Sequence, residues 1–191
     1  MQNTAYSDNG DIEGGLQRFP ESCALTELRN LVLIGHSRIT AIPAQISSLK
    51  KLKEISVNCS LSSLPKELSE LSGLTKLDLA DNMNLGYAPQ DEAFPAELGK
   101  LKSLRVLDLS HCGLRTVPSF VGGLQSLERL ALFENDEQIC ATLDILIEGC
   151  PCPRQVRLSD RCSSWTPESR AHLEAFKARL LAKNPNAKVY S

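Results

Sequence analysis

The chain has 191 residues, of which 42% are hydrophobic and 23% charged, enough apolar material for one sizeable domain. Its formal net charge of −2 and its pI near 6.0 give no electrostatic reason to expect nucleic acid or an acidic membrane as a partner. No apolar run reaches membrane-spanning length, and the polar start from Met1 to Gly10 lacks the layout of a secretory signal, which favours a cytoplasmic protein.

The first 27 residues divide into two segments. Residues 1–13 are polar and contain glycine, so we expect a flexible N-terminus without regular structure. Residues 14–27 resemble the back half of a repeat whose strand is missing, because they hold Leu16, Phe19, Pro20 and Leu25. We predict that this second segment forms an N-terminal cap or partial repeat.

Residues 28–138 carry one pattern several times. An apolar residue followed by proline recurs at gaps of 23, 22, 30 and 23 residues, at Phe19-Pro20, Ile42-Pro43, Leu64-Pro65, Phe94-Pro95 and Val117-Pro118. The fullest copy comprises Leu104, Leu107, Leu109, Cys112, Leu114, Val117 and Pro118. Related copies begin at Leu28, Leu52, Leu74 and Leu127. Repeats of this length predict a solenoid, in which stacked units bury one continuous core.

Each copy contains two apolar residues separated by one, the spacing of a strand with one buried face. These pairs are Leu31/Leu33, Ile55/Val57, Leu77/Leu79, Leu107/Leu109 and Leu130/Leu132. The prolines suit turns on the opposite, convex side, because proline has no N–H and a fixed backbone angle. A shared position after the strand holds His36, Asn82, Cys112 and Asn135. We predict that these residues satisfy backbone groups of the turn and have no catalytic role.

The pattern resembles the leucine-rich-repeat family, in particular its intracellular 23-residue class with a Leu-Pro step, over residues 16–135. The resemblance implies an α/β solenoid, curved, with short parallel strands on a concave face. Extracellular members of the family often end in a disulfide cap with a Cys-x-Cys pair. Cys150-Pro-Cys152 has that spacing, but the surrounding tryptophan and cysteine pattern is missing.

The seven cysteines are an odd number in a chain without an export signal, which predicts reduced thiols. A zinc site would have to use Cys140, Cys150, Cys152 and Cys162. These lack the usual Cys-x-x-Cys spacing, so we expect neither a metal nor a cofactor.

Residues 139–191 lose the repeat period, and we interpret them as a helix-rich α/β cap over the open end of the core. A helix is predicted from Glu137 to Glu148, with Gly149 as its stop. A second helix is predicted to start at Thr166-Pro167-Glu168, to place Leu173, Phe176 and Leu180 on one face and to end at Asn184-Pro185. Short strands are predicted at Val156–Leu158 and Lys188–Tyr190, and Trp165 is expected to pack within the cap.

Alternation also predicts the side chains that point away from the core, and these are the candidate partner-binding residues of the concave face. They are Val32, Ile34, Lys76, Asp78, Val106, Asp108, Arg129 and Phe133. Asp78 and Asp108 are expected to be neighbours, either as acceptors for a partner's basic residues or as ordinary charge balance for Lys76 and Arg129. Phe133 beside Arg129 has the composition of a binding anchor, unless the terminal helices cover it.

The 30-residue gap contains an insertion from Asn84 to Ala93. Six short strands expose a footprint on the order of 300 Å², whereas a stable interface takes roughly 800 Å² per partner. We therefore expect this loop to contribute to binding through Tyr87, Asp91 and Glu92.

These patterns favour a non-catalytic binding module, an intracellular adaptor or regulator that is itself a monomer and binds another protein. Two alternatives stay open. One is a bacterial type III effector acting in a host cytosol, which the polar start would suit. The other is a non-catalytic relative of leucine-rich-repeat ubiquitin-ligase effectors, whose catalytic domain would not fit in this length. The sequence has no phosphate-binding loop, zinc-protease motif or serine nucleophile elbow.

Overall fold

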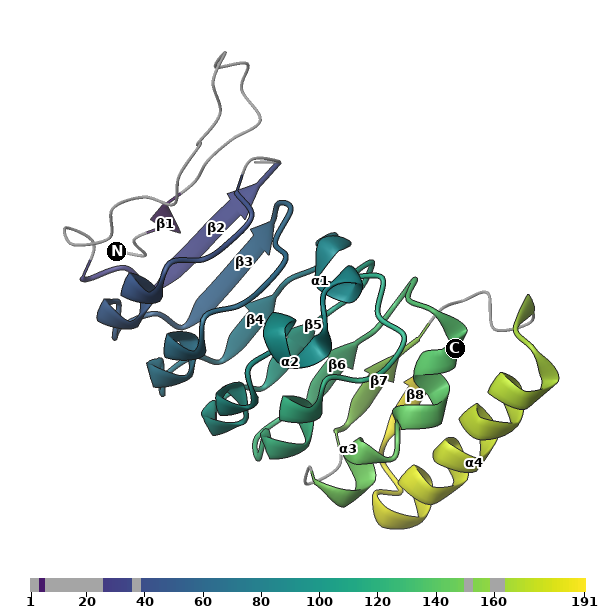
Figure 1. The fold of residues 1–191 in the computed structure, drawn as a ribbon. Coiled ribbons are helices and arrows are strands. Elements are labelled where there is room, and N and C mark those ends of the chain that lie inside the picture. The colour runs from purple at the N-terminus through teal and green to yellow at the C-terminus, as the bar shows by residue number, and fades with distance from the viewer. Residues whose placement is uncertain (1–3, 6–25, 36–38, 150–152, 159–163) are drawn as a thin grey trace.

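The strands form a single parallel sheet. The computed structural model describes residues 4–5, 26–35, 39–149, 153–158 and 164–191. Within these ranges the sheet has eight strands, and their order in space is their order in the chain (Figure 1). The strands are β1 (Thr4–Ala5), β2 (Asn30–Ile34), β3 (Glu54–Asn58), β4 (Lys76–Asp78), β5 (Val106–Asp108), β6 (Arg129–Ala131), β7 (Gln155–Arg157) and β8 (Lys188–Tyr190).

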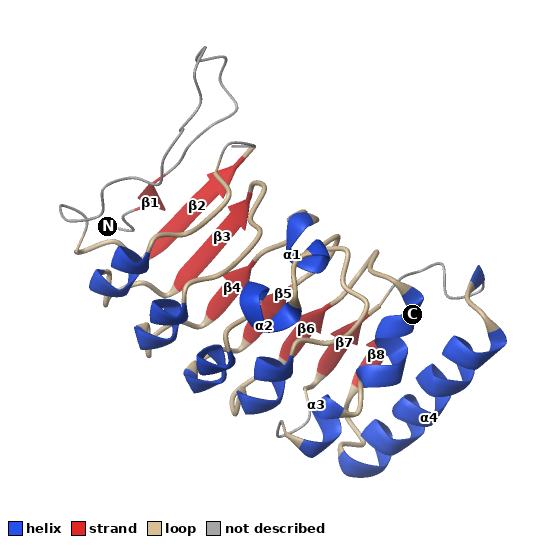
Figure 2. Ribbon diagram, in the orientation of Figure 1, coloured by secondary structure: helices blue, strands red, loops and turns tan. Residues whose placement is uncertain are grey.

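The helices pack along one side of this sheet (Figure 2). The 3₁₀ helices are η2 (Ala44–Ser48), η3 (Lys66–Glu70), η4 (Ala96–Lys100), η5 (Ser119–Gly123) and η6 (Glu137–Thr142). The α-helices are α1 (Asn84–Tyr87), α2 (Gln90–Ala93), α3 (Ile145–Glu148) and α4 (Pro167–Lys183). We call the opposite side of the sheet the strand face, defined by the outward-pointing side chains of β2–β8. The architecture is the predicted α/β repeat solenoid with helices at its C-terminal end.

The core lies between the sheet and the 3₁₀ helices. Register places the inward residues of successive strands side by side, so that Leu77 pairs with Leu107 and Leu107 with Leu130. All ten residues of the predicted apolar pairs are buried, each at most 1% exposed. The predicted strand alternation is therefore confirmed, and each unit covers the apolar surface of its neighbours.

The prolines of the repeat mark where four of the five 3₁₀ helices named above begin. Pro43, Pro65, Pro95 and Pro118 directly precede η2, η3, η4 and η5. Each proline carbonyl accepts a hydrogen bond of 3.0–3.1 Å from the N–H three residues later. The missing proline N–H costs nothing there, because the first N–H groups of a helix have no partner within it.

The C-terminal part continues the same sheet. β7 pairs with β6 and β8 pairs with β7, so residues 139–191 add two strands as well as helices. Leu173, Phe176 and Leu180 are buried on α4 as predicted, and α4 packs against η6. The helix predicted from Glu137 to Glu148 is instead split into η6 and α3. A 3₁₀ segment occupies the place that a 3₁₀ helix takes in the preceding units, and the domain boundary predicted at 138/139 falls inside it.

The N-terminal predictions fall mostly outside the described residues. These include the cap residues Leu16, Phe19, Pro20 and Leu25, so the N-terminal cap stays a prediction. His36 and the cysteines Cys23, Cys150, Cys152 and Cys162 are likewise outside the described ranges. Thr4–Ala5 nevertheless pairs with Asn30 and Leu31, which places a short strand in a segment where we expected no regular structure.

Candidate protein-binding surface

The polar position after each strand serves the fold. Asn82 is fully buried, and its amide donates hydrogen bonds to the carbonyls of Val57 and Leu79 at 2.6 and 2.8 Å. Its Oδ1 accepts from the N–H groups of Cys59 and Leu61 at 3.2 and 3.0 Å. Asn82 thus satisfies backbone groups of its own unit and of the preceding one, as the sequence predicts for this position.

The same position in other units is taken by cysteine. The Cys112 thiol donates to the carbonyl of Leu79 at 3.2 Å, and the Cys59 thiol to that of Leu33 at 3.7 Å. Burial raises the pKa of Cys112 to about 12, and the nearby Asp108 carboxylate adds to this rise. A thiol with such a pKa stays protonated at neutral pH and is a poor nucleophile. The sequence pattern missed Cys59 because its copy is one residue short.

The strand face carries two rows of outward side chains. One row runs through Glu54, Lys76, Val106 and Arg129, and the next through Ser56, Asp78, Asp108, Ala131 and Arg157. Asp78 and Asp108 are therefore direct neighbours, as alternation predicts. Val32 and Ile34 lie on β2, toward the N-terminal end of the face, and the Ile34 side chain is 42% exposed.

The two aspartates are partly engaged by local contacts. Asp108 Oδ1 accepts a 2.9 Å hydrogen bond from the N–H of Ser110, and Asp78 Oδ1 a 3.3 Å bond from that of Ala80. Lys76 Nζ lies 3.6 Å from Asp78 Oδ2. In the described part of the chain, no group of three or more His, Cys, Asp or Glu could hold a metal. Of the two roles considered for the aspartates, charge balance has a visible partner at Asp78.

Phe133 lies at the end of the β6 strand and is half-buried. Its ring centroid is 5.8 Å from that of His111, with the ring planes tilted by 53°. Helix α4 packs on η6, on the side of the sheet away from the strand face (Figure 1). The aromatic ring, the exposed Arg129 and the half-buried Val106 all belong to β5, β6 and the residues directly after β6.

A hollow of about 150 Å³ opens on the strand face over β5, β6 and β7. Asp108, Ala131, Arg129 and Arg157 line it, together with Val106 and Gln155. Its position follows from the second row, in which Ala131 has only a methyl group between two longer neighbours. Arg157 is a lining residue outside the predicted set, although its place after the buried Val156 marks it as outward-pointing.

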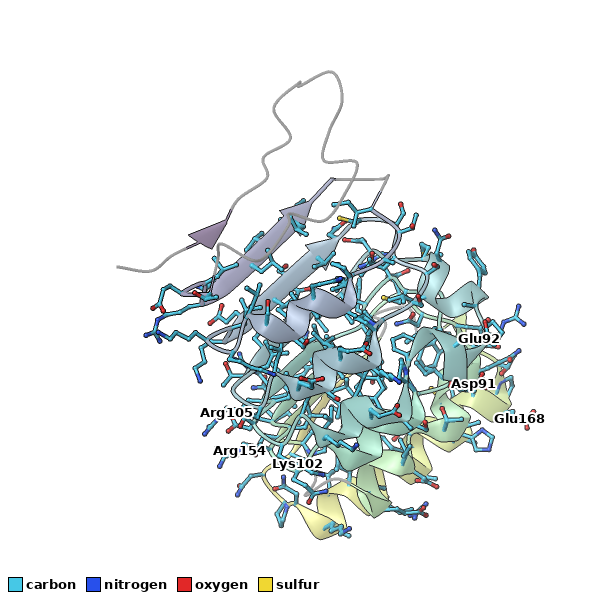
Figure 3. All side chains as sticks on the ribbon, turned by 60° about the vertical axis from the view of Figure 1, so that its left-hand side comes forward. Asp91, Glu92, Lys102, Arg105, Arg154 and Glu168 are labelled. Carbon is cyan, nitrogen blue, oxygen red and sulfur yellow. The ribbon has the colours of Figure 1, made fainter. Side chains whose placement is uncertain are left out.

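The insertion residues occupy a different surface. Figure 3 shows Asp91 and Glu92 at one edge of the molecule, with Lys102, Arg105 and Arg154 at another. Tyr87 is 76% exposed, and Asp91 and Glu92 are also exposed. Figure 1 draws α1 near the C-terminal end of β4, at the rim of the sheet, and α2 in front of the sheet on the helix side, so neither helix lies on the strand face. Any partner that touches both regions must wrap around that rim.

Close contacts fix the insertion to the following unit. Gly86 approaches Gly113 so tightly that an added Cβ would lie 2.2 Å from the Gly113 carbonyl oxygen. Gln90 Nε2 donates to the carbonyl of Thr116 at 2.9 Å. The ring of Phe94, directly after α2, stacks on that of Phe120 at a centroid distance of 5.9 Å. The exposed insertion side chains therefore sit on an ordered base.

A larger cavity of about 450 Å³ lies between η6 and the start of α4. Glu137, Glu168 and His172 are among its lining residues. The Glu137 carboxylate accepts a 2.8 Å hydrogen bond from the N–H of Thr166, so this contact ties η6 to the residue that caps α4. None of the predicted binding residues lines this cavity.

One repeat of the chain matches a family model. The model described as Leucine Rich Repeat matches residues 103–124, the fullest copy of the pattern. The chain therefore contains a leucine-rich repeat at these residues, in agreement with the resemblance to the leucine-rich-repeat family. This match does not distinguish the 23-residue Leu-Pro class, which stays a prediction.

Curated relatives of this leucine-rich-repeat chain are much longer than the matched region. It is 31% identical over 147 residues to TMV resistance protein N of Nicotiana glutinosa, which covers 64% of this chain. It is 36% identical over 76 residues, or 40% of this chain, to uridine 5'-monophosphate transferase of Xanthomonas campestris pv. campestris. Each match covers 13% of the relative, so the chain spans only about an eighth of either protein.

Solved structures show the same fold. An internalin, inlF, of Listeria monocytogenes covers 87% of this leucine-rich-repeat chain at a TM-score of 0.54 and 16% identity, over 54% of its own length. The plant peptide hormone receptor RGFR1, solved in complex with RGF2, covers 71% of the chain at a TM-score of 0.51 and 22% identity, over 21% of its own length. Across the described ranges, no helix is both long and apolar enough to span a membrane.

Proposed function

We propose that the chain is a non-catalytic protein-binding module that holds its partner on the strand face. The supporting observation is the composition of that face over β5 and β6, where Val106 lies between Lys76 and Arg129 in one row and Phe133 follows at the end of β6. Val106 is half-buried beside the exposed Arg129. Arginine and aromatic side chains are enriched among interface anchors. The leucine-rich-repeat fold itself supports a protein-interaction role.

The chemistry of the described residues favours binding over catalysis. Cys112 is held protonated by burial, and its thiol is directed at backbone carbonyls. The Asp78 and Asp108 carboxylates are engaged by backbone N–H groups and, at Asp78, by Lys76. A general acid–base pair needs convergent partners around a reacting atom. The contacts of these groups stabilise the turns and strands of the repeat units.

The insertion provides a second contact region in this proposal. A stable interface takes roughly 800 Å² per partner, more than short strands alone expose. Tyr87 offers a large exposed aromatic surface, and the nearby Met83 is 45% exposed. Because α1 is fixed to the next unit through Gly86, these side chains can bind without the cost of ordering a loop.

Photo-crosslinking tests the proposal. A benzophenone amino acid replaces Val106 or Phe133 on the strand face, and Glu97 on η4 serves as an exposed control on the helix side. We expect both strand-face positions to crosslink the same protein in lysate of the native host, and unlabelled wild-type chain to compete for it. Crosslinks confined to the Glu97 position would contradict the proposal.

The cellular role that we propose is a monomeric cytoplasmic adaptor. An effector delivered into another cell would use the same binding surface, so the two roles differ in location and not in structure. A tagged chain expressed in its native organism distinguishes them, because an effector appears in the medium or in host cytosol when its secretion system is active. Retention inside the producing cell is the result expected for an adaptor.

A further inference from the structure

The hollow over β5, β6 and β7 has the size of one side chain. Small-molecule pockets usually measure about 300–1,000 Å³, whereas this hollow measures about 150 Å³. Its floor is the methyl group of Ala131, and its walls come from neighbouring strands on either side. A partner can therefore insert a single side chain here while the rest of its segment lies across the strands.

Two arginines border the hollow from adjacent strands. Arg129 on β6 and Arg157 on β7 are both exposed, and they occupy neighbouring rows, since Arg157 pairs with Ala131. Neither guanidinium forms an ion pair with any residue that the structure describes. By contrast, Arg105 at the molecular edge is 2.8 Å from Glu128, and Lys76 is 3.6 Å from Asp78. The guanidinium donors at the hollow are thus available to a partner.

The charge around the hollow selects the kind of side chain. Two guanidinium groups and the single carboxylate of Asp108 leave one positive charge in excess. One oxygen of Asp108 already accepts from the Ser110 N–H, so this carboxylate is held toward its own turn. One monovalent anion would balance the excess, whereas a doubly charged phosphate would leave a net negative charge beside Asp108. Arginine matches the planar carboxylate with paired N–H donors.

We propose that the hollow receives an aspartate or glutamate side chain of the protein partner, bound by Arg129 and Arg157. This inference rests on the proposed function, because it names the chemistry of the partner at the strand face. It also assigns Arg157 to the binding surface, in addition to the partner-binding residues predicted from the sequence. Val106 and Ala131 would contact the aliphatic part of the inserted side chain.

Selection of random displayed peptides on the immobilised full chain tests this inference. We expect enriched peptides to share one Asp or Glu at a fixed position, and wild-type chain in solution to elute them. Synthetic copies with acetylated and amidated ends carry no terminal charge. Changing the shared Glu to Gln, or Asp to Asn, should weaken binding about tenfold, the usual loss for one charged hydrogen bond.

Two matched variants locate the effect. R129Q/R157Q removes both charges at the hollow, and R105Q/R154Q removes two charges from the edge labelled in Figure 3. The acidic and amide peptides should bind R129Q/R157Q equally well. The losses of binding free energy from the protein change and from the peptide change are then not additive, as expected for groups in contact. With R105Q/R154Q, the tenfold difference should persist.

The outcomes separate the two proposals. Peptides that bind at the strand face without a shared acidic residue, or whose acidic preference survives R129Q/R157Q, overturn the carboxylate inference and leave the proposed function standing. Enriched peptides whose binding is lost on changes at the helix side and not at Val106 overturn both. Unchanged thermal unfolding of both double variants shows that the arginine changes act on binding and not on folding.

Discussion

The inward and outward positions of the same strands repeat to very different degrees. At one inward register the sheet stacks Leu31, Ile55, Leu77, Leu107 and Leu130, all of them buried. At the adjoining outward register it places Asn30, Glu54, Lys76, Val106 and Arg129, which share no common chemistry. Stacking requires similar side chains on the inside, whereas the outside only has to remain soluble. The outward rows are therefore where this chain can differ from other solenoids.

Truncating two adjacent residues of β5, one inward and one outward, should give the largest difference in stability between the two faces. Leu107→Ala should lower the free energy of unfolding by about 4 kcal/mol, because Leu107 is fully buried between neighbouring leucines and leaves a cavity. Val106→Ala, one residue away on the strand face, should cost about 1 kcal/mol or less. Urea unfolding followed by circular dichroism measures both, and equal losses would contradict the assignment of the two faces.

The turn asparagine extends the comparison to polar groups. Asn82→Ala should destabilise the chain by about 3 kcal/mol, since buried N–H and C=O groups of two units lose their partners. Asn58→Ala on the strand face removes only an exposed 2.8 Å hydrogen bond to Asp81. We expect this control to change stability by less than about 1 kcal/mol. A mild effect at Asn82 in the same urea experiment would show that water replaces the lost bonds.

The insertion shows the same division between a buried and an exposed side. Gly86→Ala should cost about 2 kcal/mol although alanine favours helices, because the new methyl would meet the backbone of Gly113. Gly73→Ala is the matched control, since its methyl would meet only the mobile end of Lys53 at 2.8 Å. Thermal unfolding should distinguish the two variants. A Gly86 variant as stable as the Gly73 variant would mean that α1 shifts freely.

High pH should lower the stability of the folded chain through the buried thiol of Cys112. Below about pH 9 the Cys112 thiol is neutral in both states, but above it the unfolded thiol loses its proton while the folded one, with a pKa of about 12, keeps it. Stability should therefore fall as pH rises from 9 toward 12, by at most about 1.4 kcal/mol per pH unit from this group. The difference between wild type and Cys112→Ala, measured by urea unfolding at several pH values, isolates this contribution. A difference that does not vary with pH would exclude it.

The smallest change in stability is expected for substitutions of exposed arginines on the strand face. R129Q/R157Q should change the free energy of unfolding by less than about 0.5 kcal/mol, because both side chains are exposed and neither has an ion-pair partner among described residues. The same urea experiment provides the measurement. A loss of several kcal/mol would mean that these arginines support the fold, and their proposed role in binding would need reconsideration.

Much of the fold could be predicted because the same sequence pattern occurs in several copies along the chain. The alternation around Leu77 and Leu107 identified the buried face. The prolines were expected only to form turns on the opposite side, where they precede 3₁₀ helices. Single deviations were harder to place. Cys59 was not recognised in the turn position because its copy is one residue short, and the helix predicted from Glu137 divides into two.

The candidate site was only partly predictable for a related reason. Alternation identified Asp78 and Asp108 as neighbours, since both occupy the same position in their copies of the pattern. The hollow forms because the side chain of Ala131 is short. The sequence of one strand cannot predict it, since the longer side chains around it come from the two neighbouring strands. The contact of Gly86 with Gly113 likewise joins two units, so the sequence of either unit alone does not predict it.

The agreement between strand order and chain order has a consequence for how this protein is made. Each strand pairs only with the strands directly before and after it, so no strand must wait for a partner synthesised much later. A unit can dock on its predecessor as soon as it leaves the ribosome, and the nascent chain need not expose a long unpaired sheet. Folding can thus advance in the direction of translation, with α4 and β8 added to the core after the strands that precede them.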